Sequence, residues 1–136
     1  MVKKMSTKLT ILQVLPALER GGVERGTVQI DNAIVDKGWD SIVVSNGGKM
    51  VDELKGKHLQ LSLDTKNPLK ILFHVHIIKQ IIKQNDVDIV HARSRAPAWS
   101  AYLACRNSKA KFLTTFHGTY KIQNGFKRWY NGVMTK

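Results

Sequence analysis

Two kinds of hydrophobic pattern alternate along the chain. Short, dense apolar runs are typical of buried strands, and longer stretches in which apolar residues recur every three or four positions are typical of helices with one buried side. The short runs predict strands over residues 9–15, 41–45, 58–63, 88–92 and 111–116. The periodic stretches predict helices over residues 23–37, 69–84 and 98–105, the last with Pro97 near its start.

The same positions predict which faces are buried. The expected core stripe of the first helix is Val23, Thr27, Ile30, Ala33 and Ile34, and that of the second helix is Leu72, Val75, Ile78 and Ile82. Residues 58–63 alternate leucine with polar residues, which indicates a strand near the sheet edge with one covered face.

Strands that alternate with helices predict a doubly wound, mostly parallel α/β sheet with helices on both faces, which is a Rossmann-like fold. A length of 136 residues suits a single domain. Ligands of such folds bind outside the carboxyl ends of the strands. The loops of interest are therefore residues 16–22, 45–49, 92–96 and 117–120.

The chain is strongly basic, with 22 Lys and Arg against 10 Asp and Glu and a formal charge of +12. This charge favours nucleic acid, anionic lipid or phosphorylated small molecules as partners. Four of the six arginines, Arg20, Arg25, Arg93 and Arg95, lie in or just beyond two of these loops. Arginine binds phosphate through two parallel hydrogen bonds, so their gathering indicates a compact anionic ligand. Because the lysines are spread along the chain, a nucleic-acid-binding module is the less favoured alternative.

Several kinds of site can be set aside. Cys105 is the only cysteine, which excludes an internal disulfide, indicates a reducing cytoplasmic compartment and suits a core position. His74 and His76 lie two residues apart on a predicted helix, hence on different faces, so no metal site is expected. No glycine elbow surrounds Ser94 or Ser100, and no hydrolase triad is visible.

Residues 21–26, GGVERG, follow the first predicted strand and open the first predicted helix. The free N–H groups and the dipole at such a helix start attract an anion. The glycine spacing differs from the dinucleotide fingerprint, and no acidic residue ends the second strand, which excludes a nicotinamide-dependent dehydrogenase. A flexible connection without a ligand is the alternative reading of these glycines.

Three segments together resemble the amino-terminal domain of family 4 glycosyltransferases. They are ILQVLPALERGGVER at residues 11–25, DIVHARSRAPAW at 88–99 and FLTTFHGTY at 112–120. The resemblance implies two Rossmann-like domains in the glycosyltransferase-B fold, of which the first receives the acceptor and the second holds most of the nucleotide-sugar donor. It also implies a retaining reaction that needs neither a metal nor a cofactor.

The resemblance also implies roles for individual residues. Gly21 and Gly22 match the family's glycine loop, which approaches the donor diphosphate and the acceptor. His117 matches the histidine at the catalytic cleft, and Gly118 follows it in the same signature. We expect His91 to line the cleft, and the four arginines Arg20, Arg25, Arg93 and Arg95 to contribute to donor or acceptor binding.

The second domain and its Glu-x7-Glu signature lie outside the 136 residues. We therefore expect an excerpt, or a split or truncated gene product, whose domain is incomplete at its C-terminal end and which turns over little alone. A non-catalytic remnant is the alternative. The fifth strand would be an open edge, which favours self-association.

The tail at residues 126–130, FKRWY, pairs aromatic with basic side chains. Together with the net charge, this pairing favours peripheral docking to an anionic inner membrane face and a lipid-linked or lipopolysaccharide-type acceptor.

Overall fold

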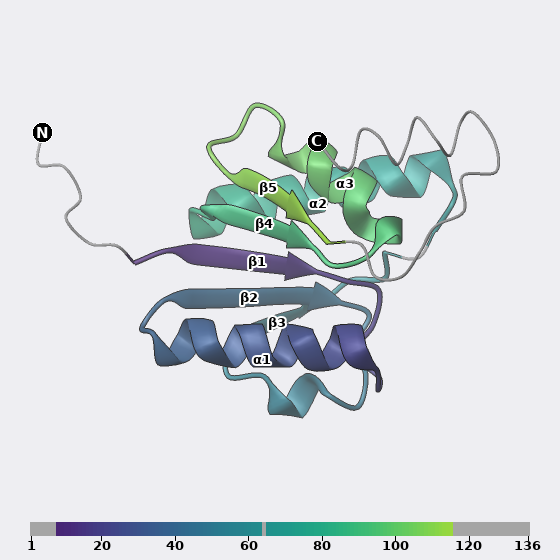
Figure 1. Cartoon of the computed structure of the whole chain (residues 1–136). Coiled ribbons are helices and arrows are strands. Elements are labelled where there is room, and N and C mark those ends of the chain that lie inside the picture. Colours follow the sequence, from purple (N-terminus) through teal and green to yellow (C-terminus); the bar gives the residue numbers. More distant parts are fainter. Residues whose placement is uncertain (1–7, 64, 116–136) are drawn as a thin grey trace, which may run out of the picture.

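The described chain is a parallel five-stranded sheet with helices on both faces, seen in a computed structural model that describes residues 8–63 and 65–115 (Figure 1). The strands lie across the sheet in the order β3-β2-β1-β4-β5. Their bounds are Thr10–Val14 for β1, Asp40–Ser45 for β2, Lys57–Gln60 for β3, Ile89–Ala92 for β4 and Lys111–Thr114 for β5. The predicted doubly wound, Rossmann-like fold is confirmed.

Three α-helices connect these strands. Helix α1 (Gly22–Asp36) joins β1 to β2, α2 (Pro68–Asn85) joins β3 to β4, and α3 (Arg95–Cys105) joins β4 to β5. A short 3-10 helix, η1 (Val51–Glu53), lies between β2 and β3. Figure 1 shows α1 on one face of the sheet and α2 and α3 on the other. From β1 the chain adds β2 and β3 on one side, and it then returns to add β4 and β5 on the other side. Because parallel connections are right-handed, the helices of the two halves lie on opposite faces of the sheet.

Each face of the sheet has its own core. On the α2 and α3 side, Leu12 and Val14 of β1 pack with Ile78 and Val90 in the larger cluster. On the α1 side the buried cluster consists of Leu15, Leu18, Val28, Val43 and Met50. Cys105 is 8% exposed and belongs to the larger core, where burial raises the pKa of its thiol to about 11. The prediction of a core cysteine is confirmed.

The predicted core stripe of α1 was partly wrong. Ile30 is 43% exposed and Ala33 is exposed, whereas Asp31 is completely buried. The Asp31 carboxylate accepts hydrogen bonds from the backbone N–H groups of Lys55 and Gly56, at 2.8 and 3.1 Å. The buried side of α1 is therefore centred near an acidic residue, which a pattern of apolar positions assigns to solvent.

The predicted stripe of α2 was wrong at Leu72, whose exposure is 62%. The helix buries His74, Ile78, Ile81 and Ile82 instead. Two successive steps of three residues, from position 72 to 78, rotate the side-chain direction by about 120° in total. Leu72 therefore cannot share a face with Ile78.

The carboxyl ends of the strands lie at the same edge of the sheet. Val14 of β1 is the register partner of Ala92 of β4 and of Val44 of β2, and Ala92 is the partner of Thr114 of β5. Strands β3 and β5 are the two outer strands, which confirms the prediction of an edge strand after β2. The loops that follow β1, β4 and β5 are thus neighbours.

Candidate functional site at the strand carboxyl ends

The loop after β1, residues 15–21, is fixed to the loop after β2. The N–H of Leu18 donates to the carbonyl of Gly47 at 2.8 Å, and the N–H of Met50 donates to the carbonyl of Leu18 at 2.8 Å. Gly48 has a φ of +144°, and a Cβ at this position would collide with the backbone of Leu18. This fixed path sets where α1 begins.

Helix α1 begins at the site without a side-chain cap. Its N-cap residue, Gly21, has extended backbone and makes no side-chain cap hydrogen bond. Gly21 and Gly22 are exposed, and the N–H groups of the first turn have no acceptor within the helix. The carboxylate of Glu24 folds back against Gly21. This negative charge at the positive end of the helix dipole occupies the place that a bound anion would take.

A buried polar network lies beneath the first turns of α1. Arg93, directly after β4, donates from Nη1 to the Oε1 of Gln13 at 3.2 Å. Gln13 donates in turn from Nε2 to the carbonyl of Thr27 at 3.1 Å. Gln13 and Thr27 are completely buried, and Arg93 is 7% exposed. The network joins β1, α1 and the carboxyl end of β4.

The charge of Arg93 is buried without a counter-ion. Among the described residues no carboxylate pairs with it, and its Nε has no hydrogen-bond partner. Desolvation lowers the pKa of the guanidinium, but an arginine remains charged in proteins. A positive charge so placed, beside a helix N-terminus, favours an anion at this edge of the sheet.

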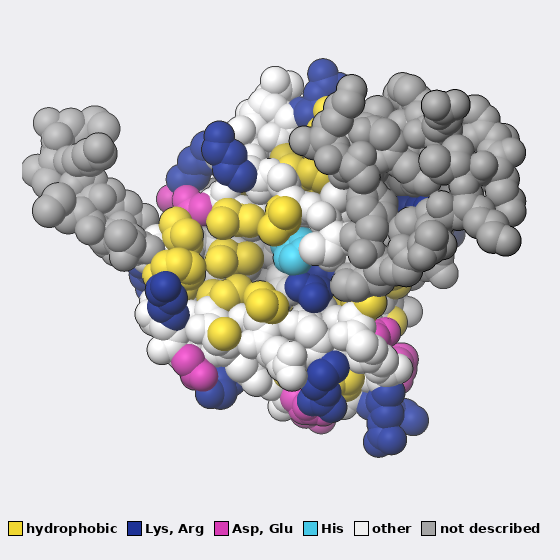
Figure 2. Space-filling view, viewed as in Figure 1, with side chains coloured by type: hydrophobic (Ala, Val, Ile, Leu, Met, Phe, Trp, Pro, Cys, Tyr) yellow, Lys and Arg dark blue, Asp and Glu magenta, His cyan; other side chains and the backbone are white. Residues whose placement is uncertain are grey.

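His91 lies on the same strand face as Gln13 and is its register partner across β1 and β4. Its Nε2 is 3.3 Å from the Oγ1 of Thr115, the residue that follows β5. Figure 2 shows hydrophobic side chains gathered over the strand face above α1, with a histidine side chain at their edge. On this face Ile89 is half-buried and Leu113 is 49% exposed. The half-buried His91 therefore lies between an apolar strand surface and the polar network.

A second helix start lies beside the first. Arg95 is the first residue of α3, which follows the carboxyl end of β4. Its N-cap, Ser94, makes no side-chain cap hydrogen bond, and the first turn of α3 contains no acidic residue. Arg95 is half-buried. The positive end of the α3 dipole thus lies at the carboxyl end of β4, on the face of the sheet opposite α1.

The predicted site residues do not all lie at one place in the described structure. The structure brings the Gly21–Gly22 turn, His91 and Arg93 to the carboxyl ends of β1 and β4, with Arg95 at the start of α3. Arg20 is exposed in the loop before α1. Arg25 is engaged elsewhere, because its Nη1 lies 2.5 Å from the Oε2 of Glu53 in η1. His117 and Gly118 lie outside the described residues.

Sequence reasoning missed Gln13, Gly26 and Thr27. A glutamine inside an apolar strand run and a glycine inside a helix were the available signals, because buried amides need partners and helical glycines often mark a close approach. A Cβ at Gly26 would stand 2.9 Å from the Nη2 of Arg93. A side chain at residue 26 would therefore require the guanidinium to shift.

Two other histidines of the described residues, His58 and His74, are at least partly buried within the fold. His58 of β3 contacts the Oγ of Ser45 at 2.8 Å, and this hydroxyl accepts the N–H of Gly47 at 3.1 Å. Burial lowers the pKa of His58. His74 is buried in α2, while His76 is exposed. Within residues 8–63 and 65–115 no three His, Cys, Asp or Glu side chains are close enough to hold a metal ion.

Comparison with known proteins shows the family of the chain. The family model described as Glycosyltransferase Family 4 matches residues 20–136. The chain is similar to a solved glycosyltransferase from Rickettsia africae ESF-5, with 51% identity and a TM-score of 0.84, covering 95% of this chain and 35% of that one. The chain thus spans about a third of the length of that relative. A comparison with curated proteins gave no match.

Two more distant structures share the fold. MurG from Acinetobacter baumannii has 15% identity and a TM-score of 0.67, covering 93% of this chain and 38% of that one. A putative UDP-N-acetylglucosamine 2-epimerase from Listeria monocytogenes has 17% identity and a TM-score of 0.65, covering 94% and 37%. At such identities the likeness concerns the fold alone. The family match takes in every described element after β1, and the chain therefore belongs to glycosyltransferase family 4.

Proposed function

We propose that this chain is the acceptor-side half of a retaining, metal-independent glycosyltransferase. The sugar would pass from a nucleotide sugar to a lipid-linked or lipopolysaccharide-type saccharide. The observation that carries the proposal is the buried guanidinium of Arg93, which pairs with no carboxylate of the described residues and lies beneath the first turns of α1. The family membership of the chain supports it.

The chemistry of sugar transfer explains such an arrangement. Negative charge develops on the diphosphate as it leaves the sugar, and fixed N–H dipoles and cations stabilise this charge in the transition state. The turn at Gly21 and Gly22 supplies N–H groups, and Arg93 supplies a buried positive charge that is hydrogen-bonded to Gln13 and lies against Gly26. Arg20, Arg95 and His91 would then contact the outer phosphate or the acceptor.

His117 is proposed as the catalytic histidine, and Gly118 as its neighbour at the cleft. Both follow β5, whose carboxyl end is paired with that of β4, where Arg93 begins the next loop. Their place in the chain therefore suits a role beside the diphosphate. Arg25 would join the site only after leaving Glu53.

The donor's nucleoside is expected to bind mainly to a second domain, as the family resemblance implies. This chain covers 35% of the Rickettsia glycosyltransferase, and we propose that sugar transfer also requires the part of such a protein that holds the donor. None of the helices in the described ranges has the length and hydropathy that a bilayer crossing requires. As a separate part of the proposal, a lipid-linked acceptor would be met by peripheral docking at a cytoplasmic membrane face.

The proposed anion site can be tested with inorganic pyrophosphate. We expect pyrophosphate to raise the melting temperature of the chain, and Arg93→Met to weaken its affinity about tenfold or more through loss of a charge-assisted contact. Arg106→Met is the matched control, because Arg106 is exposed at the end of α3. Circular dichroism of both variants checks folding.

Equal pyrophosphate affinity of Arg93→Met and the original chain would overturn the proposal. A single-stranded oligonucleotide provides the second arm. Steeply salt-dependent binding of the oligonucleotide that does not depend on Arg93 would favour the nucleic-acid-binding alternative.

A further inference from the structure

Strands β4 and β5 have one face that no described helix covers. Helix α1 packs on β2 through Val28 and Val43, and it reaches β1 through the hydrogen bond between Thr27 and Gln13. Helices α2 and α3 lie on the other side of the sheet (Figure 1). Parallel sheets are normally covered on both faces. Within the described part of the chain, the α1 side of β4 and β5 is therefore an unpartnered surface.

This surface carries hydrophobic side chains in register. Ile11 of β1 pairs with Ile89 of β4, and two residues further along β4 His91 pairs with Leu113 of β5. Ile11 and Ile89 are half-buried, and Leu113 is 49% exposed. We call Ile11, Ile89 and Leu113 the open apolar face.

The open apolar face ends at the candidate anion site. Alternate residues of a strand share a face, so Arg93 continues the row of Ile89 and His91 at the carboxyl end of β4. The Arg93 side chain is 7% exposed, and its Nε has no hydrogen-bond partner. Gly26 lies against this guanidinium, and Ile30, one turn further along α1, is 43% exposed. Figure 2 shows hydrophobic side chains on one side of a histidine and a basic side chain on its other side.

We propose that the open apolar face binds the hydrocarbon chain of an anionic amphiphile whose phosphate lies at Arg93. The inference rests on the proposed function, because it gives a place to the lipid part of a lipid-linked acceptor. The donor diphosphate would reach Arg93 from the Gly21 turn, and the phosphate of the acceptor would reach it from the side of His91.

Charge complementarity selects this occupant. The face has a buried positive charge at one end, and no carboxylate of the described residues pairs with it. The rest of the face is apolar apart from His91, and Lys111 is exposed at its far end. A phosphate on a hydrocarbon chain matches both parts, because the guanidinium pairs with the phosphate and the chain removes apolar side chains from water.

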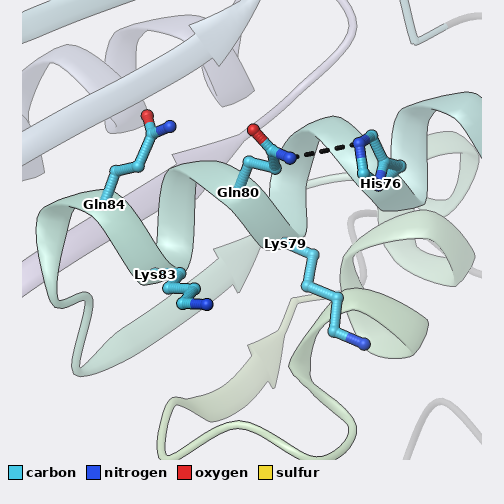
Figure 3. A pocket seen from close by; sticks show the side chains of 5 residues that line it. All are labelled: His76, Lys79, Gln80, Lys83 and Gln84. Atoms are coloured by element: carbon cyan, nitrogen blue, oxygen red, sulfur yellow. Dashed lines mark hydrogen bonds between the residues drawn. The ribbon is translucent and has the colours of Figure 1, made fainter.

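A hollow on α2 has the charge but not the apolar surface. His76, Lys79, Gln80, Lys83 and Gln84 line about 570 Å³, and a hydrogen bond of 3.1 Å joins the side chains of Gln80 and His76 (Figure 3). All five side chains are polar and exposed. The two lysines therefore provide a control for unspecific attraction of phosphate.

Calorimetric titration of the 136-residue chain with ethyl phosphate and with octyl phosphate below its micelle concentration tests the proposal. Each methylene removed from water strengthens binding by up to about fourfold, so octyl phosphate should bind at least about tenfold more tightly. Arg93→Met should weaken the binding of both ligands about tenfold or more, through loss of a charge-assisted contact. Lys79→Gln combined with Lys83→Gln should leave both affinities unchanged.

Leu113→Ser tests the hydrocarbon end of the site. It should reduce the preference for octyl over ethyl phosphate about threefold or more, and it should leave the affinity for ethyl phosphate unchanged. Leu72→Ser is the matched control, because Leu72 is 62% exposed but belongs to α2 on the other side of the sheet. Both leucines are exposed, so both melting temperatures should stay close to that of the original chain.

Equal affinities for ethyl and octyl phosphate would overturn the proposal, as would equal effects of Leu113→Ser and Leu72→Ser. A dimer that depends on Leu113 and excludes octyl phosphate, seen by sedimentation, would assign the face to a second copy of the chain and would also overturn it. If pyrophosphate binding depends on Arg93 but the octyl preference is absent, only this inference falls. An octyl preference that requires Leu113, with pyrophosphate binding that does not depend on Arg93, would support the lipid site and remove the proposed function.

Discussion

The guanidinium of Arg93 lies against the backbone of Gly26, so close that a Cβ at residue 26 would stand 2.9 Å from Nη2. The two residues are far apart in the sequence, yet together they set how near α1 approaches the end of β4. This contact is the basis of the candidate anion site. It also makes the helix depend on a glycine where alanine would be the better helix former.

Gly26→Ala should lower the melting temperature despite its gain in helix propensity. Alanine contributes about 1 kcal/mol over glycine in a helix, but overpacking of a buried contact costs about 1–3 kcal/mol. Gly22→Ala is the matched control, because nothing lies within 4 Å of a Cβ there. Thermal unfolding of both variants measures the difference, and a Gly26→Ala variant more stable than Gly22→Ala would contradict the contact.

Glu24→Gln should strengthen pyrophosphate binding. The Glu24 carboxylate lies against Gly21 at the start of α1, where it competes with an incoming anion. Removing its charge should raise affinity by about twofold to fivefold, because charges at a helix start contribute about 0.3–1 kcal/mol. Asp52→Asn removes an exposed charge outside α1 and should leave the affinity unchanged. Weaker binding of Glu24→Gln in calorimetric titration would count against the α1 site.

Gly48→Ala should destabilise the fold far more than Gly38→Ala. Both glycines have positive φ, at +144° and +87°, but only a Cβ at Gly48 collides with backbone, that of Leu18. Strained backbone alone costs about 1–3 kcal/mol, and the collision adds to it at Gly48. Urea unfolding of the two variants provides the comparison. Similar midpoints would show that the loops after β1 and β2 are less tightly joined than described.

The stability of the chain should fall below neutral pH, partly because of His74. Burial, and then the charge of Lys70, lower the pKa of His74 in the folded state below its usual 6.5. The unfolded chain therefore takes up a proton more readily. The stability due to neutral His74 is present above pH 6.5 and is lost as the pH falls towards the lowered pKa of the folded state.

Urea unfolding at about pH 7.5 and about pH 5.5 measures this loss. His74→Leu should reduce the difference between the two conditions, and the exposed His76→Gln should leave it unchanged. An undiminished pH dependence in His74→Leu would assign the effect to other groups, of which His58 is the first candidate because its pKa is also lowered by burial.

Much of the fold follows from local patterns. Strands β1, β2, β4 and β5 lie in apolar runs and β3 begins the stretch that alternates leucine with polar residues, while helices on both faces of the sheet follow from right-handed parallel connections. Errors arose where a polar residue is buried. Asp31 shifted the apparent face of α1, because a carboxylate bound to backbone N–H groups cannot be distinguished in a sequence from an exposed one. The prediction that Leu72 is buried was wrong for the converse reason, because a sequence does not distinguish an exposed leucine from a buried one.

The sequence predicted where in the fold the candidate site lies, but not which side chains contact one another there. The rule that ligands bind at strand carboxyl ends identified Gly21, Gly22, His91 and Arg93. It could not show that Arg93 points beneath α1, because Gln13 and Gly26 lie in other segments and meet it only after folding. For the same reason it could not show the ion pair of Arg25, whose partner Glu53 belongs to a 3-10 helix that the pattern did not reveal.

The chain of contacts from Arg93 through Gln13 to Thr27 restricts how this sequence can evolve. A smaller residue at 93 would strand the Gln13 amide oxygen in a dry interior, and a side chain at 26 would displace the guanidinium. A change at one of these sites therefore alters the environment of the others. Descendants that abandon the arginine should show replacement at 13 as well, a signature that pairwise covariation among homologues can reveal.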